Sequence, residues 1–521
     1  MSDVPSVPPT VFLVGAGPGD PGLLTVRAAE LLARADLVVY DQLVPRRLLD
    51  FANPSAELLC VRDLPGNHPD KYPHIHELLI ASGQAGKVVV RLKGGDPLVF
   101  GRGGEEAEAL RAAGIGYEIV PGVTAAFAAA AYLDIPLTHR KHASAVALVT
   151  GHELPNKPGN RLDWQALAAF PGTLAIYMGI ARLPLIVSEL LKYGKPPDTP
   201  AGIVERASTG DMRTAFAPLK DLESARRHAG LEAPGLILVG NAIDQRIAKS
   251  WFESRPLFGH RVLVTRPRHQ AGPMMRRLEL LGAVPLLLPT LAIREPTDFT
   301  AFDAALDRLR NHEWDWIVFT SVNGVQAFVR RLLARGRDLR DFGGVKLAAI
   351  GSKTAEALRE FHLTPDVVPP DFIAESLAAT LMPAVAGQRV LLARANRGRD
   401  VLRQELAKTA QVEQVTVYEQ IDGIAPEASE LAALRRGEIR FVTLSSSNVA
   451  RGLLAMFDDT IRGRIHRGEI QLIAISPETG RVVRELGYPV AAEATVYTAE
   501  GLVEAVQKLA RTVRSSPHDE L

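Results

Sequence analysis

The chain has 521 residues, a hydrophobic fraction of 47%, a charged fraction of 23% and a formal net charge of +1. One hydrophobic core cannot serve this length, so about three domains are predicted. The near-zero charge gives no field that would recruit nucleic acid or an anionic membrane, and the single cysteine, Cys60, excludes an intramolecular disulfide and a Cys-based zinc site. We therefore expect no nucleic-acid partner and no metal.

Residues 1–10 contain three prolines and no basic segment followed by an apolar one. This composition predicts a flexible leader and not a secretion signal. The most apolar stretch, residues 123–137, is interrupted by Asp134 and Pro136 and is too short to span a bilayer. A cytoplasmic protein without a membrane segment is the expectation.

The first predicted unit is a strand, a glycine-rich loop at residues 15–22, a helix opened by Thr25, and a second strand at 37–40. Such a loop suggests a dinucleotide-binding fingerprint, with Asp41 as the acid that binds the ribose. The spacing contradicts this hypothesis, because Asp20 occupies the position of the third glycine. Two prolines also stiffen a loop that would have to curl around a pyrophosphate.

A second loop, residues 91–106, reads Arg-Leu-Lys-Gly-Gly-Asp-Pro-Leu-Val-Phe-Gly-Arg-Gly-Gly-Glu-Glu and joins a predicted buried strand to a predicted helix. Its five glycines allow backbone to lie against a ligand where a Cβ would collide. Asp96 is the only acid between Arg91 and Gly104, and we expect Arg91, Lys93 and Arg102 to place three positive charges around it. The loop is predicted to hold a small polar ligand.

Further glycine-bearing turns follow predicted strands at residues 121–125, 177–179 and 204–210. Strands and helices that alternate in this way predict an α/β domain with its site along the carboxyl edges of the strands. A last strand at residues 236–240 closes this region.

This region resembles the uroporphyrinogen-III C-methyltransferases of the tetrapyrrole methylase family over about residues 11–252. The matching stretches, in the family's order, are residues 14–25, 39–41, 94–106, 120–125, 135–140, 150–152 and 177–179. The resemblance implies a fold of two α/β subdomains and a cytoplasmic enzyme that uses S-adenosylmethionine (SAM). It also implies a homodimer formed through this half.

The resemblance implies nine residues that line the SAM pocket. They are Pro18, Gly94, Gly95, Asp96, Val99, Thr124, Ala125, Met178 and Ala207. Asp41 matches the aspartate that the family is proposed to use as proton acceptor, a role that is needed because methylating a pyrrole carbon leaves a cationic ring. Structural alternatives stay open, with Met178 as filling for the core and Asp41 as a cap at a strand end.

The chain departs from the family after the third strand. Where the family usually has Gly-Lys-Arg, with the lysine proposed as proton donor, this chain reads Cys60-Val-Arg-Asp-Leu-Pro-Gly66. Asp63 falls at the place of the lysine. Either Arg62 or Lys71 substitutes for it, or the lysine is dispensable, or methyl transfer is weakened.

From about Arg261 the chain repeats itself. Residues 320–324 recur at 445–449 and residues 350–354 at 475–479, each 125 positions later, and residues 261–266 recur at 389–394, 128 positions later. Two copies of one α/β unit predict two similar lobes with a cleft between them. In each copy a strand ends in hydroxyl residues before a helix, which suits either anion binding or ordinary N-capping.

This half resembles uroporphyrinogen-III synthase over about residues 258–513. The supporting stretches are residues 262–267, 317–325, 349–355, 415–418 and 445–447. The resemblance implies two flavodoxin-like lobes, one of residues 258–293 with 420–513 and the other of residues 297–418. A connector at 253–257 and a tail at 514–521 complete the predicted organisation.

The family's substrate, hydroxymethylbilane, is a linear tetrapyrrole with eight carboxylates that loses its hydroxyl and closes with one ring inverted. Because it also reacts spontaneously, the enzyme chiefly folds it and selects one product. We expect carboxylate binding by hydroxyls, helix-start donors and two arginines, namely Thr320, Ser321, Asn323, Gly351, Thr354, Ser446, Thr479, Arg266 and Arg394. Tyr418 matches the family tyrosine proposed to assist loss of the hydroxyl, and its alternative role is that of a strand aromatic.

The two resemblances together predict a bifunctional enzyme of tetrapyrrole synthesis. Its second half makes uroporphyrinogen III and its first half methylates that product twice to precorrin-2, on the way to sirohaem or cobalamin. Two alternatives are a methylase of the same fold with another substrate, such as a translation factor or ribosomal RNA, and an active methylase fused to a tetrapyrrole-binding sensor or scaffold without turnover.

Overall fold

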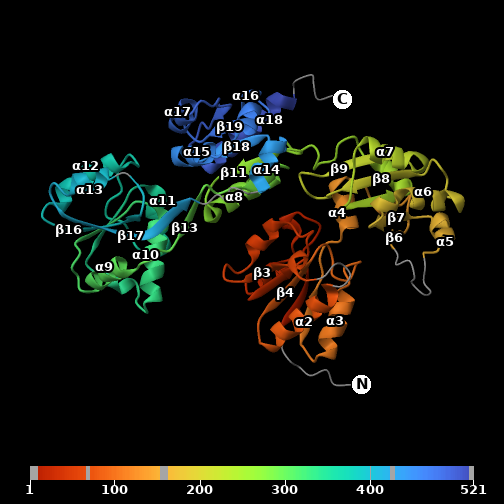
Figure 1. Cartoon of the computed structure of the whole chain (residues 1–521), viewed down its shortest axis with the longest axis horizontal. Coiled ribbons are helices and arrows are strands. Elements are labelled where there is room, and N and C mark those ends of the chain that lie inside the picture. Colours follow the sequence, from red (N-terminus) through yellow and green to blue (C-terminus); the bar gives the residue numbers. More distant parts are fainter. Residues whose placement is uncertain (1–9, 66–70, 153–161, 399, 423–428, 515–521) are drawn as a thin grey trace. The chain divides into compact units, whose positions relative to one another are not determined.

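The computed structural model describes residues 10–65, 71–152, 162–398, 400–422 and 429–514 (Figure 1). The predicted leader up to residue 9 and the predicted tail from residue 515 lie outside this range. Contacts divide the chain into two compact units. The first is Met1–Val262 with Arg276–Pro285 and Gln507–Leu521, and the second is Leu263–Met275 with Leu286–Val506. The predicted domain boundaries at 252 and 258 stay predictions.

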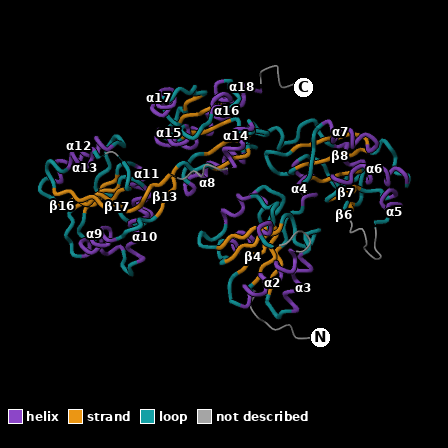
Figure 2. Tube along the Cα trace, in the orientation of Figure 1, coloured by secondary structure: helices purple, strands orange, loops and turns teal. Residues whose placement is uncertain are grey.

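The predicted α/β class is confirmed, because the described strands form four five-stranded sheets and helices alternate with strands along the chain (Figure 2). None of the helices in the described ranges is both long enough and apolar enough to cross a membrane.

The first sheet is parallel throughout, with the strand order β3-β2-β4-β1-β5. Its elements are β1 (Val11–Gly15), α1 (Val26–Leu32), β2 (Leu37–Tyr40), β3 (Glu57–Cys60), α2 (Lys71–Gln84), β4 (Val89–Lys93), α3 (Gly103–Ala112) and β5 (Tyr117–Val120). As predicted, Thr25 begins α1, and its hydroxyl accepts a hydrogen bond from the N–H of Ala28 at 3.2 Å. Since all strands run the same way, the loops that follow them gather at one edge.

The second sheet is mixed, with the order β6-β7-β10-β8-β9. Only β6 and β7 pair in parallel among its neighbours, and β10 runs antiparallel to both β7 and β8. Its elements are α4 (Ala125–Tyr132), β6 (Val146–Thr150), α5 (Trp164–Ala169), β7 (Thr173–Tyr177), α6 (Leu183–Lys192), β8 (Pro200–Glu205), β9 (Arg213–Pro218), α7 (Leu222–His228) and β10 (Gly235–Val239).

The third sheet has the order β12-β11-β18-β19-β20, which is the flavodoxin-like order 2-1-3-4-5. Its strands are β11 (Arg261–Val264), β12 (Val284–Leu287), β18 (Phe441–Leu444), β19 (Gln471–Ala474) and β20 (Ala492–Glu493). Its helices are α8 (Arg268–Leu280), α14 (Ser429–Arg436), α15 (Ser447–Leu454), α16 (Asp459–His466), α17 (Pro477–Glu485) and α18 (Ala499–Arg514).

The fourth sheet has the order β13-β17-β16-β14-β15, and read from β15 it follows the same pattern, with β13 added antiparallel at the far edge. Its strands are β13 (Leu291–Arg294), β14 (Trp316–Phe319), β15 (Lys346–Ala349), β16 (Arg389–Ala395) and β17 (Gln411–Asp422). Its helices are α9 (Thr300–Arg310), α10 (Val322–Ala334), α11 (Ser352–Glu360), α12 (Ala374–Val385) and α13 (Val401–Leu406). The repeated sequence segments lie on β11 and β16, directly after β14 and β18, and directly after β15 and β19, and the neighbouring strands β11-β18-β19 and β16-β14-β15 stand in the same order.

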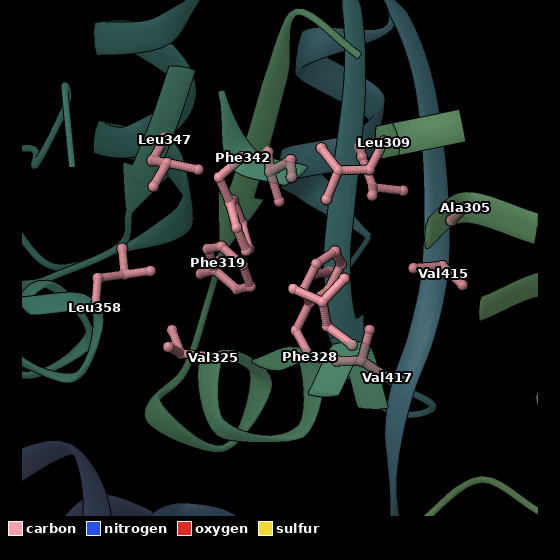
Figure 3. Packing of buried hydrophobic residues seen from close by; sticks show 14 of the residues in the cluster. Ala305, Leu309, Phe319, Val325, Phe328, Phe342, Leu347, Leu358, Val415 and Val417 are labelled. Atoms are coloured by element: carbon pink, nitrogen blue, oxygen red, sulfur yellow. The ribbon is translucent and has the colours of Figure 1, made fainter. Parts of the chain in front are cut away.

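The core of the fourth sheet shows how strand alternation builds these layers. Ile317 and Phe319 of β14 belong to one buried cluster. Figure 3 shows Phe319 and Phe328 of this cluster, whose rings meet edge-on at 5.5 Å. Trp316 and Val318 belong to the cluster on the opposite face. Because alternate side chains are buried on both faces, β14 reads as a continuous apolar run, as expected for a parallel strand covered by helices on both sides.

Candidate functional site

Three loops at the carboxyl edge of the first sheet touch through their backbones. Gly17 and Gly95 exchange backbone hydrogen bonds of 3.1 and 2.8 Å. A Cβ on Gly122 would lie 2.2 Å from the carbonyl oxygen of Gly95 and 2.8 Å from Cα of Gly15. Because such separations exclude any side chain at position 122, Gly122 allows this close approach of the loops.

Asp96 ties two of these loops together. Its carboxylate accepts hydrogen bonds from the N–H of Leu98 at 2.8 Å and from the N–H of Gly122 at 3.1 Å. A Cβ on Gly95 would contact Thr124 and Ala125, so these two predicted residues, which follow Gly122, lie beside this loop. Val99 and Gly94 belong to the same loop, and Gly94 is exposed.

The three cations predicted to surround Asp96 do not do so. Arg91 and Lys93 are each 1% exposed, and they face Asp41 and Glu106 from β4. Arg102 pairs with Glu105 and lies over the ring of Tyr72. The prediction was wrong because residues two apart on a strand share a face, and buried cations on that face must find carboxylates there.

Tyr177 connects three of the predicted stretches, and sequence reasoning missed it. Its hydroxyl lies 2.7 Å from Oγ1 of Thr124 and accepts a hydrogen bond from the N–H of Ala126 at 3.0 Å. Its ring lies 4.9 Å from that of Phe100. Burial raises the pKa of Tyr177, so the hydroxyl is a neutral donor and acceptor. The available signal was its position immediately before Met178 in a matching stretch.

Met178 is 51% exposed, so the alternative that it fills the core is wrong. Its φ of 54° is left-handed, as are those of Phe100, Arg102, Arg206 and Ser208, all in the loops predicted to bind the ligand. Residues other than glycine in this region store strain, which gathers at functional sites. These loops are therefore held in a fixed shape by the surrounding structure.

The first glycine loop meets the loop that contains Ala207. The N–H of Asp20 donates to Oγ of Ser208 at 3.3 Å, and a Cβ on Gly19 would collide with Thr209. The carboxylate of Asp20 also accepts from the hydroxyl of Tyr132 at 2.5 Å. Pro18, next to Gly19, thus lies beside Ala207, and the structure brings all the loops of the predicted SAM pocket into contact.

Asp41 follows β2 directly, and its side chain is 32% exposed. Its Oδ1 accepts from the guanidinium of Arg91 at 2.5 Å. The side chain of Leu43 lies against the position that a Cβ of Gly94 would take, so Asp41 belongs to the same loop cluster. Asp63, at the place of the family lysine, is exposed and paired with Arg62. For Lys71, which begins α2, the side chain lies outside the described atoms.

In the fourth sheet, Tyr418 and Ser321 come together. The two hydroxyls are 3.0 Å apart, and Ser321 also accepts from the N–H of Gly324 as the N-cap of α10. Tyr418 is 5% exposed and belongs to the same buried cluster as Phe319 and Phe328. A role in catalysis would therefore operate through its hydroxyl at the start of α10, beside Thr320 and Asn323.

The remaining predicted residues of the second half divide between the two sheets. Gly351 begins α11 without a side-chain cap, Thr354 is buried, and the buried Arg394 donates to Gln414 at 3.0 Å. In the third sheet Ser446 is the N-cap of α15, and the hydroxyl of the buried Thr479 lies 3.3 Å from that of Ser476. Burial lowers the pKa of Arg266, and the negative charge of Glu500 partly offsets this decrease. Ser321 and Ser446 are thus N-caps, the ordinary alternative left open by the sequence.

Fold and site define a two-part α/β protein, with a glycine-lined loop cluster in the first part and a duplicated flavodoxin-like second part. The family model described as tetrapyrrole (corrin/porphyrin) methylases matches residues 10–223, and the model described as uroporphyrinogen-III synthase HemD matches residues 273–504. The chain is 34% identical to the porphyrin biosynthesis protein HemD of Ruminiclostridium josui over 493 residues, which are 93% of this chain and 96% of that protein.

Two further matches cover the first half. The S-adenosyl-L-methionine-dependent uroporphyrinogen III methyltransferase of Methanosarcina barkeri is 46% identical over 233 residues, 45% of this chain and 91% of that protein. The crystal structure of the uroporphyrin-III C-methyl transferase of Thermus thermophilus with S-adenyl homocysteine is 42% identical, covers 45% of this chain and 98% of its own, and has a TM-score of 0.39. The chain belongs to the family in which a tetrapyrrole methylase is fused to a uroporphyrinogen-III synthase, and both predicted resemblances are confirmed.

Proposed function

We propose that this chain catalyses two consecutive steps of tetrapyrrole synthesis. It cyclises hydroxymethylbilane to uroporphyrinogen III and then transfers two methyl groups from SAM to that product, which gives precorrin-2. The observation that carries this proposal is the match of both family models within one chain, together with a relative aligned over 93% of its length. The fusion is chemically coherent because the product of one half is the substrate of the other.

We assign methylation to residues 11–252 and cyclisation to residues 258–513, joined by a connector at 253–257. The lobes of the second part are proposed as residues 258–293 with 420–513 and residues 297–418. The duplicated strand orders of the third and fourth sheets support two similar lobes. A cytoplasmic homodimer assembled through the methylase half completes the proposal.

The loop cluster fits SAM. Gly94 offers exposed backbone, Met178 offers a half-exposed apolar side chain, and Asp96 stands partly exposed between the Gly95 and Gly122 loops. SAM supplies an electrophilic methyl group on a sulfonium. Support for its use comes from the Methanosarcina barkeri relative, whose name states this dependence.

Asp41 is proposed as the base of the methyl transfer. The bond from the methyl carbon to the pyrrole carbon forms as the carbon–sulfur bond breaks, and the resulting cationic ring loses a proton to the Asp41 carboxylate. The side chain is exposed enough to meet a substrate, and Arg91 holds one of its oxygens at 2.5 Å. The other oxygen is oriented by the same contact.

For the cyclisation, the proposed work is folding of the octa-acid rather than covalent catalysis. The starts of α10, α11, α15 and α17 are proposed to offer carboxylates those N–H groups that the serine caps leave free. Arg266 and Arg394 are proposed to supply charge, and the Tyr418 hydroxyl is proposed to assist departure of the substrate hydroxyl. A sensor without turnover is the second candidate, because Tyr418 is almost fully buried.

One coupled assay tests both activities. The full chain is incubated with hydroxymethylbilane and methyl-labelled SAM, in parallel with Asp41→Asn. We expect type III product without SAM, labelled precorrin-2 with SAM, and loss of label but not of type III product in Asp41→Asn. Type I product alone would support the sensor, and undiminished label in Asp41→Asn would contradict the base assignment.

A further inference from the structure

Four ionisable side chains form a continuous chain of contacts under the loop cluster. Glu106 Oε1 accepts from Nε of Arg91 at 2.9 Å and from Nζ of Lys93 at 2.8 Å, and Arg91 continues to Asp41 at 2.5 Å. The side chain of Glu106 is 0% exposed, and those of Arg91 and Lys93 are 1% exposed. Only Asp41, at 32%, reaches the surface.

Burial of these charges is costly, and stability alone does not call for it. Well-packed apolar residues of similar volume often stabilise a core as well as a buried ion pair does. Burial and the neighbouring charge of Arg91 lower the pKa of Lys93, which shows the strain of the arrangement. Within the described structure, Oε2 of Glu106 is also buried and accepts no hydrogen bond. A buried cluster that costs this much stability and has one exposed member, Asp41, points to a function for that member.

Geometry identifies the role. Arg91 has a long side chain with several rotatable bonds. The Glu106 carboxylate accepts a hydrogen bond from its Nε, and its Nη2 donates to Asp41. Backbone oxygens of Val39 and Leu92 lie 3.4 Å from its Nη1 and contribute only weak contacts. The direction of Arg91 therefore depends chiefly on Glu106.

We propose that Glu106 is a positioning residue for methyl transfer. Through Arg91 it holds the Asp41 carboxylate in its reactive orientation, and Lys93 supplies the second positive charge of the buried cluster. This inference rests on the proposed function of Asp41 as the base. Glu106 lies in the first turn of α3, directly below the glycine loop, so the same strand-to-helix connection shapes the loop and anchors the base.

Two charge-matched double variants of the full chain separate positioning from stability. Lys93→Met with Glu106→Gln and Lys93→Met with Glu106→Leu each remove one positive and one negative charge. They differ in one respect, because only glutamine leaves an oxygen that can accept from Nε of Arg91. Glu223→Leu is the control for loss of a carboxylate shared by two cations, since Glu223 pairs with Arg226 and Arg227 on α7, away from the loops.

The readouts are kcat and KM for SAM-dependent methylation and the thermal unfolding midpoint. We expect similar midpoints for the two doubles, unchanged KM for SAM, and a kcat about 10- to 100-fold lower in the leucine double than in the glutamine double, the scale of loss for a misplaced catalytic group. Glu223→Leu is expected to shift the midpoint without lowering kcat. Equal kcat in the two doubles would overturn the proposal.

A crystal structure of the leucine double gives a second readout that does not depend on activity. We expect Arg91 to lose its contact with Asp41, and a contact retained within 3.5 Å would overturn the inference. If the wild-type chain transfers no methyl group, the proposed function fails, and this geometric test still decides whether Glu106 orients Asp41.

Discussion

Gly122→Ala tests whether the loop cluster is held by direct backbone packing. The added Cβ would lie 2.2 Å from the Gly95 oxygen and 2.8 Å from Cα of Gly15. Ordinary contacts between such atoms begin near 3.4 Å, so the loops must separate by roughly 1 Å. Neither neighbour is a side chain that rotates away, and overpacking of this kind costs about 1–3 kcal/mol.

Separation of the loops also breaks a hydrogen bond. The Gly122 N–H donates to the Asp96 carboxylate at 3.1 Å, and a shift of this size takes the pair beyond hydrogen-bonding distance. A hydrogen bond to a charged group contributes about 1.5–3 kcal/mol. Together the two effects predict a loss of about 2.5–6 kcal/mol in the free energy of unfolding. Because Thr124 and Ala125 move with Gly122, we also expect an affinity for S-adenosylhomocysteine at least about tenfold lower.

The assays are urea denaturation followed by circular dichroism and calorimetric titration with S-adenosylhomocysteine. Gly104→Ala is the matched control, because Gly104 lies in the first turn of α3 and no atom lies within 4 Å of its added Cβ. We expect this control to gain up to about 1 kcal/mol through reduced chain entropy. Wild-type stability and affinity in Gly122→Ala would refute the close packing of the three loops.

Two further predictions concern the second half. Tyr418→Phe removes the hydroxyl contact with Ser321, so we expect urea denaturation to show a free energy of unfolding about 1 kcal/mol lower. We also expect slower formation of the type III product. An unchanged rate would assign Tyr418 to the core alone. The hydrogen bond from Arg331 lowers the pKa of Asp303 in the folded protein. The ion pair therefore stabilises the fold fully at pH values above the pKa of this aspartate in the unfolded chain. This stabilisation is lost as the pH falls through the lower pKa that Asp303 has in the folded chain. Asp303→Asn should cost up to about 1 kcal/mol at pH 7 and less near pH 3, and a cost independent of pH would contradict the pairing.

The fold was readable from the sequence where local pattern and tertiary context agree. The apolar runs of β1 and β14, the N-cap at Thr25 and the repeat displaced by 125 residues all appear as predicted elements. The antiparallel strands of the second sheet were not anticipated, because a short buried strand carries no sign of the direction in which its neighbour runs.

The site was readable where its residues lie in loops and unreadable where they lie beneath them. Glycines and prolines in a sequence indicate a loop of defined shape, so the stretches around Gly94 and Gly122 could be proposed as parts of the binding site. A charged residue in a strand gives no indication of the face it occupies or of its partner. Arg91 and Lys93 were therefore placed around Asp96, although alternation along β4 turns both toward Glu106.

The same alternation bears on Asp63, which stands at the place of the family lysine. Asp63 is exposed and pairs with Arg62, whereas the cation that pairs with Asp41 is Arg91 of β4, from within the sheet. A buried guanidinium stays charged across the whole physiological range and can orient Asp41 without supplying a proton. If orientation of the base is what the reaction requires, Arg91 and Glu106 supply it, and Lys93→Met with Glu106→Leu should damage methyl transfer far more than Asp63→Lys improves it. A large gain from Asp63→Lys would instead show that a proton donor is missing at that position.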